Sequence, residues 1–337
     1  MMVSVEISVA ADRFRAALAN RWHAVLTAAE LLDRPVGVRL LGRPLVLARL
    51  RGRPACLDDV CRHLGAALSL GEVVDGHALR CSYHGWAYDG GGRCVDIPAR
   101  RGAPIPRGAQ VASYPTEERY GLIWVCLETP EAAAIPELPE FSDPAFRVTA
   151  PRTYEPWRAS APRVVMGALD DTHFGWVHPG LLGDPDTPEA PDHEAHREGD
   201  YLITSYSVEQ PGTLSSMGTG ICETVNYRNA ATPTSIRLVK RSATGTYVIF
   251  MAVQPVDADR SHVYLLTARD FDLDPAGDER YLTFEDTLQA QDRVVIESQR
   301  PWLLPPLESR LALYIRPADL PLIEFQRWLE ELGIPQV

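Results

Sequence analysis

The sequence predicts an α+β protein of two domains. Its 337 residues suffice for about two domains of roughly 150 residues each, and each can bury a sizeable core. Short segments with alternating apolar residues, separated by turns that contain many of the 24 Gly and 28 Pro, indicate antiparallel sheets. A few segments with helical spacing lie between and after these strands.

The N-terminal part is predicted to be a small antiparallel β domain that follows one helix at residues 11–30. Short strands are expected within residues 36–42, 44–52 and 54–60, and the apolar segment 120–128 closes the domain. The Pro-rich stretch that follows is typical of a linker. We therefore place the domain boundary near residue 135, which gives domains 1–135 and 136–337.

The second domain is predicted to combine a sheet with helices. Residues 163–178 have helical spacing, and residues 200–270 alternate in the manner of strands. A helix at residues 278–300 is expected to stop at Pro301, and the chain ends with an amphipathic helix for which Gly333 is a suitable cap. This domain is therefore expected to be α+β.

Composition and charge exclude several classes of protein. A net charge of -12 and a pI near 5.2 disfavour nucleic acid or anionic membrane as a partner, because both repel an acidic surface. The start of the chain lacks the pattern of a signal peptide, and apolar runs are far below the roughly 18 residues of a membrane span. We expect a cytoplasmic protein, in which paired cysteines more often hold metal than form disulfides.

The first candidate metal site consists of two short Cys/His loops. Cys61 and His63 form a CxH pattern, and after seventeen intervening residues Cys81 and His84 form a CxxH pattern. Two thiolates and two imidazoles suit either a tetrahedral zinc or a two-iron, two-sulfur cluster in which two His replace two Cys. Zinc fingers usually pair Cys with Cys and His with His, whereas each loop here supplies one of each, which favours the cluster.

The segment from Cys61 to Trp86 resembles the cluster-binding segment of Rieske proteins. This resemblance implies that Cys61 and Cys81 hold the inner iron, while His63 and His84 hold the outer iron.

The second candidate metal site lies in the predicted C-terminal domain. Asp170 and His173 are three residues apart and share a helix face, and His178 precedes Pro179, so we expect the helix to bend or end there. Two His and one carboxylate form the ligand set of non-haem Fe(II) oxygenases. A surface acid and two ordinary histidines are the alternative interpretation.

The carboxylate ligand is expected on the helix at residues 278–300. Asp292 is expected to share an apolar face with Leu288, Val295 and Ile296, where an unpaired carboxylate is costly. Asp286 is expected on a polar surface instead, and Glu285 is a weaker third choice. We therefore select Asp292.

The segments 167–180 and 291–301 resemble the mononuclear-iron motif and the carboxylate segment of Rieske non-haem iron oxygenases, and the resemblance covers nearly the whole chain. It implies a helix-grip (START-like) catalytic domain, a head-to-tail homotrimer, and His173, His178 and Asp292 as iron ligands. It also implies that Asp170 bridges His84 of one subunit and His173 of the next. The family usually has an Asn where this chain has Met166 and Gly167, so that polar contact is not expected here.

The short single chain resembles the vanillate demethylase-like branch of monooxygenases, which implies hydroxylation or oxidative demethylation of a small organic substrate with O2. Since no GxGxxG signature follows a strand, electrons from NAD(P)H must come through a separate reductase or a ferredoxin. An electron carrier with only the first site and a zinc-binding structural module are the alternatives. The substrate cannot be read from the sequence.

Overall fold

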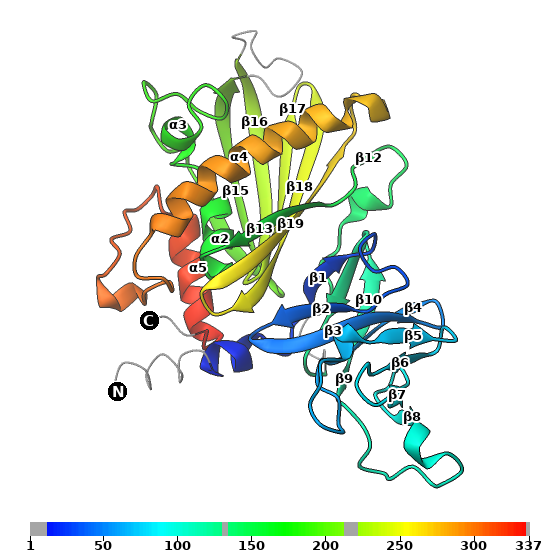
Figure 1. Ribbon diagram of the computed structural model, residues 1–337. Helices are drawn as coiled ribbons and strands as arrows, with labels where there is room; N and C mark the ends of the chain where they lie inside the picture. Colours follow the sequence, from blue (N-terminus) through cyan, green and yellow to red (C-terminus); the bar gives the residue numbers. More distant parts are fainter. Residues whose placement is uncertain (1–11, 130–133, 212–221, 335–337) are drawn as a thin grey trace. The chain divides into compact units, whose positions relative to one another are not determined.

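The computed structural model describes residues 12–129, 134–211 and 222–334. The chain divides into two compact units, one formed by Leu18–Ile135 and the other by Pro136–Val337 together with the residues before Leu18. Each unit has its own antiparallel sheets, as the α+β prediction requires (Figure 1). In the described part of the chain, no helix combines the length and the apolar character that crossing a membrane requires.

The unit Leu18–Ile135 consists of three small antiparallel sheets. The first sheet contains β1 (His23–Thr27), β11 (Leu122–Val125) and β10 (Thr116–Arg119); the second contains β2 (Val36–Leu40), β3 (Arg43–Leu50), β4 (Arg53–Asp58) and β9 (Ser113–Tyr114). The third contains β5 (Glu72–Val74), β6 (Ala78–Arg80), β7 (Ala87–Tyr88) and β8 (Cys94–Asp96). The strands predicted at 36–60 and at 120–128 are therefore confirmed.

The hairpin between β2 and β3 follows directly from its turn residues. Leu41 and Gly42 both have positive φ, at 50° and 78°, and Leu40 pairs with Arg43 across the turn. Two consecutive residues with positive φ form the turn type that matches the twist of a two-residue hairpin.

The predicted helix at residues 11–30 is wrong beyond its first part. Among the described residues of this segment, helix covers only residues 12–18, and His23–Thr27 forms strand β1 instead. All five residues of β1 are buried, and they pair with β11. Tertiary pairing therefore overrides the local helical pattern, which carries no information about a strand a hundred residues away.

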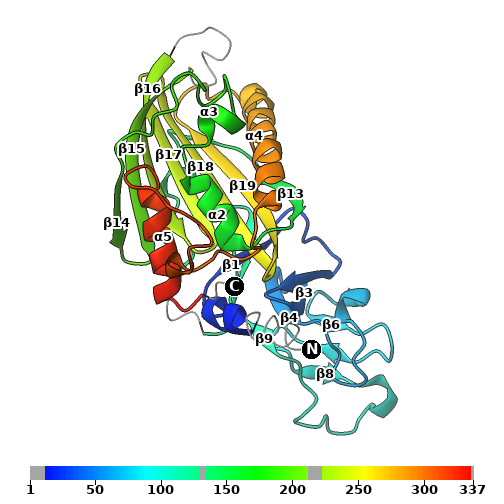
Figure 2. The ribbon, with the colours of Figure 1, turned by 90° about the vertical axis from the view of Figure 1, so that its left-hand side faces the viewer.

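The second unit is built on an eight-stranded antiparallel sheet. Its strands are β12 (Arg147–Val148), β13 (Arg152–Trp157), β14 (Glu194–Glu198), β15 (Tyr201–Pro211), β16 (Cys222–Thr232), β17 (Ser235–Ser242), β18 (Gly245–Asp257) and β19 (Arg260–Arg269). The helices α2 (Ala161–Leu169), α4 (Asp278–Ser298) and α5 (Leu320–Glu331) lie across one face of this sheet (Figures 1 and 2). The strands predicted between 200 and 270 and both C-terminal helices are confirmed.

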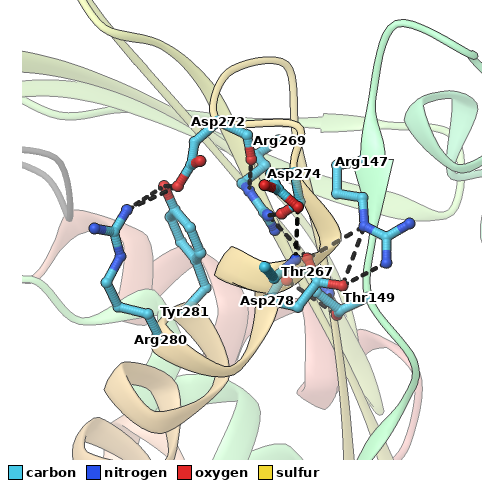
Figure 3. A network of polar contacts seen from close by, with 10 residues as sticks. Arg147, Thr149, Thr267, Arg269, Asp272, Asp274, Asp278, Arg280 and Tyr281 are labelled. Carbon is cyan, nitrogen blue, oxygen red and sulfur yellow. Dashed lines mark hydrogen bonds and ion pairs between the residues drawn. The ribbon is translucent and has the colours of Figure 1, made fainter.

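A network of ion pairs holds the start of α4 against the sheet (Figure 3). Asp278, the first residue of α4, accepts hydrogen bonds from Arg147 on β12 at 2.5 Å and from Arg269 on β19 at 2.8 Å. Arg269 is fully buried and also donates to the backbone oxygens of Asp272 and Asp274. A carboxylate at a helix N-terminus additionally interacts favourably with the helix dipole. This network fixes the helix that carries Asp292.

The C-terminal end of α5 is as predicted. Gly333 has a φ of 67°, and its N–H donates to the carbonyl of Glu330 while that of Ile334 donates to Leu329. A residue in the left-handed region just after a helix lets its last carbonyls find partners.

Candidate metal centres

The two Cys/His loops of the first unit have the same local structure. The carbonyl of Cys61 accepts a hydrogen bond from Gly65, and the carbonyl of Cys81 accepts the equivalent bond from Gly85, at 2.9 and 3.1 Å. Both glycines have positive φ, at 79° and 74°, which a residue with a Cβ adopts only with strain. The repeated glycine in the sequence thus shapes two matching tight turns.

These loops bring the four predicted donors together. The thiols of Cys61 and Cys81 are buried, whereas His63 and His84 are exposed and their Nδ1 atoms lie 3.2 Å apart. One pair of sulfur donors therefore lies inside and one pair of nitrogen donors lies at the surface. This donor chemistry fits a two-iron, two-sulfur cluster with its sulfur-ligated iron buried and its imidazole-ligated iron exposed.

The second candidate centre lies at the break between two short helices, α2 and α3. Residues 163–178 do not form the single helix that their spacing predicts, because α2 ends at Leu169 and α3 (Phe174–Val177) begins after four intervening residues. Asp170 is extended, with φ −77° and ψ 131°, so it reaches His173 across a turn rather than along a helix face. His178 immediately follows α3, as the adjacent proline predicts.

His173, His178 and Asp292 meet in space, although Asp292 lies more than a hundred residues further along the chain. Each of them places one ligand atom within 4.8 Å of the others. Oδ1 of Asp292 lies 2.9 Å from Nε2 of His178 and 3.4 Å from Nε2 of His173, and the two Nε2 atoms are 3.3 Å apart. Two imidazoles and one carboxylate that converge in this way fit a single ferrous ion.

The two other carboxylates considered on α4 are engaged elsewhere. Asp286 accepts hydrogen bonds from Arg152 and Tyr154, both at 2.9 Å. Glu285 is buried and accepts a hydrogen bond from Tyr247 at 3.1 Å. Of the three, only Asp292 is placed with the two histidines.

Comparison with known proteins gives two family matches. Residues 21–115 match the Rieske [2Fe-2S] domain, and residues 157–333 match the vanillate O-demethylase oxygenase C-terminal domain. The chain belongs to the Rieske oxygenase family. Because the second match alone covers more than half of the chain, the membership includes the catalytic part and not only the iron–sulfur part.

Relatives and solved structures extend this match over nearly the whole chain. Methylxanthine N1-demethylase NdmA of Pseudomonas putida is 34% identical over 324 residues, which cover 94% of this chain and 89% of that protein. The dicamba O-demethylase oxygenase component of Stenotrophomonas maltophilia is 42% identical over 47% of each chain. The structure of Pseudomonas putida CBB5 NdmA with caffeine matches with a TM-score of 0.85 and 32% identity, over 95% of this chain and 92% of that one.

Two polar side chains orient the histidines of this Rieske oxygenase. Oδ2 of Asp170 lies 3.5 Å from Nδ1 of His173, and its Oδ1 accepts from the backbone and hydroxyl of Thr172. Oε1 of Gln291 accepts a hydrogen bond from Nδ1 of His178 at 2.7 Å. Since Nδ1 of each ring is engaged, Nε2 of each ring remains for the metal.

The charge pairing at Asp170 outweighs its burial. Burial raises the pKa of Asp170. The hydrogen bond and charge of His173 and the hydrogen bonds from Thr172 lower this pKa by more than burial raises it, so the pKa lies below its ordinary value. The anionic form of Asp170 is therefore favoured. Gln291 was not predicted as part of the site, although its position directly before Asp292 in the sequence could have indicated it.

Tyr88 and Trp86 were also not predicted as part of the iron–sulfur site. The Tyr88 hydroxyl lies 3.2 Å from Sγ of Cys61 and accepts a hydrogen bond from the backbone N–H of Arg62, so its own hydrogen is directed to the sulfur. The Trp86 ring stacks on His63 with a centroid distance of 4.7 Å and an interplanar angle of 7°.

The polar loop sequence around His193 and His196 predicts that both side chains are solvated, and for His193 this prediction is wrong. Its side chain is fully buried, and Nε2 donates to Oδ1 of Asp171 at 2.8 Å. The prediction failed because the loop sequence does not reveal the carboxylate beside Asp170 that pairs with this ring. His196, which the same argument placed in solvent, is 60% exposed as predicted.

The absence of the usual Asn at positions 166 and 167 has a packing explanation at Gly167. A Cβ atom there would lie 2.6 Å from Cδ1 of Ile296 on α4. Because α2 and α4 approach this closely, a side chain at Gly167 would require Ile296 to shift. Met166 is buried, and its sulfur lies 3.9 Å from the Tyr314 hydroxyl.

Proposed function

We propose that this chain is the oxygenase component of a multicomponent monooxygenase, which uses O2 and two electrons to hydroxylate or oxidatively demethylate a small organic substrate. The observation that carries this proposal is the presence of two donor sets of different chemistry in one chain, the paired Cys/His loops and the group His173, His178 and Asp292. A protein that only carries electrons has no use for the second set.

We assign residues 1–135 to the iron–sulfur domain and residues 136–337 to the catalytic domain. All four cluster donors lie in the compact unit Leu18–Ile135, and the three donors of the other centre lie in the second unit. In the first unit, Cys61 and Cys81 would hold the inner iron, and His63 and His84 would hold the outer iron.

In the catalytic domain His173, His178 and Asp292 would hold a mononuclear iron. When bound, the cluster supplies single electrons and the ferrous ion supplies the activation of dioxygen. The protein orients the ligands: Asp170 and Gln291 hold the two imidazole rings through Nδ1, and the network at Asp278 holds the helix that carries Asp292.

We further infer that the enzyme is a head-to-tail homotrimer in which electrons pass between neighbouring subunits. Asp170 would accept hydrogen bonds from His173 of its own chain and from His84 of the neighbouring chain. Two features support this role: Oδ2 of Asp170 faces His173, and the imidazole edge of His84 is exposed.

Electrons are expected from NAD(P)H through a separate reductase, with or without a ferredoxin. Because NAD(P)H is a cytoplasmic reductant, we infer a cytoplasmic location. Methylxanthine and dicamba demethylases are among the relatives, so we infer oxidative demethylation as the reaction class. These relatives differ in substrate, and their names therefore do not assign one to this chain.

The experiment that tests the proposal is a count of iron and zinc per chain in the purified protein, combined with electron paramagnetic resonance. We expect about three irons per chain, a reduced-cluster signal, and loss of one iron in a His173→Ala, His178→Ala double variant. Two irons in the wild type would make the protein an electron carrier, and zinc without the brown colour of an iron–sulfur protein would make it a structural module.

A further inference from the structure

Lys240 is the only lysine of the chain, since all the other basic residues among its 33 Lys and Arg are arginine. It lies on β17, in the middle of the catalytic sheet, and only 8% of the residue is exposed. Lysine is seldom buried without a partner, because removing an ammonium group from water is costly. Its position therefore requires an explanation that the iron ligands do not provide.

The strand register places Lys240 in a row of buried side chains that crosses five strands. Tyr206 pairs with Tyr227, Tyr227 with Lys240, Lys240 with Tyr247, and Tyr247 with Arg269. Directly paired residues of neighbouring strands point to the same face. Tyr247 of this row donates a hydrogen bond to Glu285 on α4, so the row lies on the face that the helix covers.

The charge of Lys240 is not balanced in the way that other buried charges are. Its Nζ lies 5.4 Å from the centroid of the Tyr227 ring, and among the described residues it has no carboxylate within ion-pair distance. The buried Arg269, in contrast, pairs with Asp278, and the buried Arg163 donates to Gln299 and to several backbone carbonyls. Lys240 is thus a buried basic side chain for which the described residues provide no ion-pair partner.

Glu285 on α4 is an acidic side chain whose charge interacts with that of Lys240, although the two do not form an ion pair. Burial raises the pKa of Glu285 above its ordinary value, although the charge of Lys240 lowers it and the charge of Asp292 raises it. Burial therefore shifts the protonation equilibrium of Glu285 toward its neutral form. The same interactions show that Glu285 lies near both Lys240 and the candidate iron ligand Asp292.

A chain of aromatic contacts also leads from the iron ligands to Lys240. The ring of Phe174 lies 5.1 Å from His173, 6.3 Å from His178 and 6.3 Å from Tyr227, measured between centroids. Tyr227 is in turn the residue whose ring contacts Lys240. Two aromatic rings, Phe174 and Tyr227, therefore connect Lys240 with the metal-binding side chains.

We propose that Lys240 is a specificity-determining residue that binds an anionic oxygen, a carboxylate or a phenolate, of an aromatic substrate lying against Phe174 and Tyr227. The ammonium donates a charge-assisted hydrogen bond to this oxygen and holds the opposite end of the substrate toward His173 and His178. This inference rests on the proposed oxygenase function and adds the charge of its substrate.

The test is an equilibrium binding experiment on the iron-loaded enzyme with three pairs of probes: 4-methoxybenzoate, 3,4-dimethoxybenzoate and 1-naphthoate, each against its uncharged amide. A charge-assisted hydrogen bond predicts that at least one acid binds about 10- to 100-fold more tightly than its amide. Lys240→Met is expected to abolish this preference, and Lys240→Arg to retain most of it. Arg241→Met, which removes a neighbouring charge from the exposed face of the same strand, is expected to leave the preference unchanged.

A second measurement uses only the wild-type chain, so its result does not depend on whether a variant folds. Because Lys240 is the only lysine, acetylation of the wild-type chain at a side-chain amine can be located by mass spectrometry without ambiguity. Acids of the probe set, but not their amides, are expected to slow acetylation of Lys240. The inference is overturned if no acid binds better than its amide, if the preference persists in Lys240→Met, or if acids give no protection. A chain with three irons and no such preference would refute only this inference, whereas two irons per chain would refute the proposed function.

Discussion

Nδ1 of His178 donates a hydrogen bond to Oε1 of Gln291, 2.7 Å away, and Gln291 directly precedes Asp292 on α4. One turn of helix therefore supplies both the carboxylate of the candidate iron site and the acceptor that orients a histidine of the same site. The His178 side chain is only 1% exposed, so water does not replace Gln291 easily as a partner.

Replacing Gln291 with Leu is expected to weaken iron binding at the mononuclear site about 10- to 100-fold while the iron–sulfur cluster remains. The ring of His178 would lose the bond that fixes its orientation and tautomer. Titration of the metal-free site with Fe(II), followed by the bound-iron count, measures the effect. Thr287→Ala, on an exposed part of the same helix, is the control and should bind iron as the wild type does.

Asp170→Asn is expected to retain about three irons per chain and to lose turnover by about 10- to 100-fold. The amide oxygen still accepts a hydrogen bond from His173, but the negative charge that holds this ring and a neighbouring His84 is lost. Steady-state oxygen consumption and the rate of cluster reduction are to be measured together, with Asp186→Asn as an exposed control. Unchanged turnover would refute the bridging role.

Tyr88→Phe is expected to lower the reduction potential of the cluster by at most about 65–130 mV. The hydroxyl donates to Sγ of Cys61 and so stabilises the more negative, reduced form. A hydrogen bond to a charged group contributes about 1.5–3 kcal/mol, and about 59 mV corresponds to a tenfold change for one electron. Redox titration monitored by visible circular dichroism measures the shift. Tyr114→Phe, whose hydroxyl donates to Asp58 instead, should leave the potential unchanged.

Acid is expected to destabilise the first unit through His23. Burial lowers the pKa of His23 to about 4, while the backbone carbonyl of Leu18 accepts a bond from its Nε2. Between about pH 6.5 and pH 4 the unfolded chain binds a proton that the folded chain does not, so the free energy of unfolding falls as the pH falls through this window. The contribution is fully present above about pH 6.5.

His23→Gln keeps a side-chain donor and removes this titration. Urea unfolding at pH 7.5, 6 and 5 should therefore show the wild type losing about 1–2 kcal/mol relative to the variant by pH 5. His196→Gln, at an exposed histidine, should track the wild type at every pH. A constant difference between His23→Gln and the wild type across the three pH values would contradict the assignment.

Asp278→Asn is expected to lower the free energy of unfolding by about 2–3 kcal/mol, because the buried Arg269 loses its ion-pair partner. Figure 3 shows that Asp278 joins this arginine and Arg147 at the start of α4. Thermal and urea unfolding measure the loss. Glu279→Gln removes an exposed partner of Arg152 and should change stability by less than about 0.5 kcal/mol; an equal effect of both variants would refute this explanation.

The sequence by itself determined the chemistry of the two candidate sites. Metal preference depends on which donor atoms are present and how closely they are spaced along the chain. The Cys61–His63 and Cys81–His84 loops show both the donor atoms and their spacing directly in the sequence. The apolar face predicted around Asp292 distinguished it from Asp286 before any fold was known, because an unpaired carboxylate on a buried face is costly. It did not distinguish Asp292 from Glu285, which is also buried, and Val295 of the predicted face is exposed.

The tertiary structure decided what depends on contacts between distant segments. His23–Thr27 became a strand because β11 pairs with it, and His193 became buried because Asp171 accepts its hydrogen bond. The sequence also did not predict three further features: the hydrogen bond of His178 to Gln291, the Tyr88 hydroxyl beside Cys61 and the burial of Lys240. The pattern of residues within one segment indicates which conformation that segment prefers. Burial and strand pairing, in contrast, depend on contacts between segments that are brought together only when the chain folds.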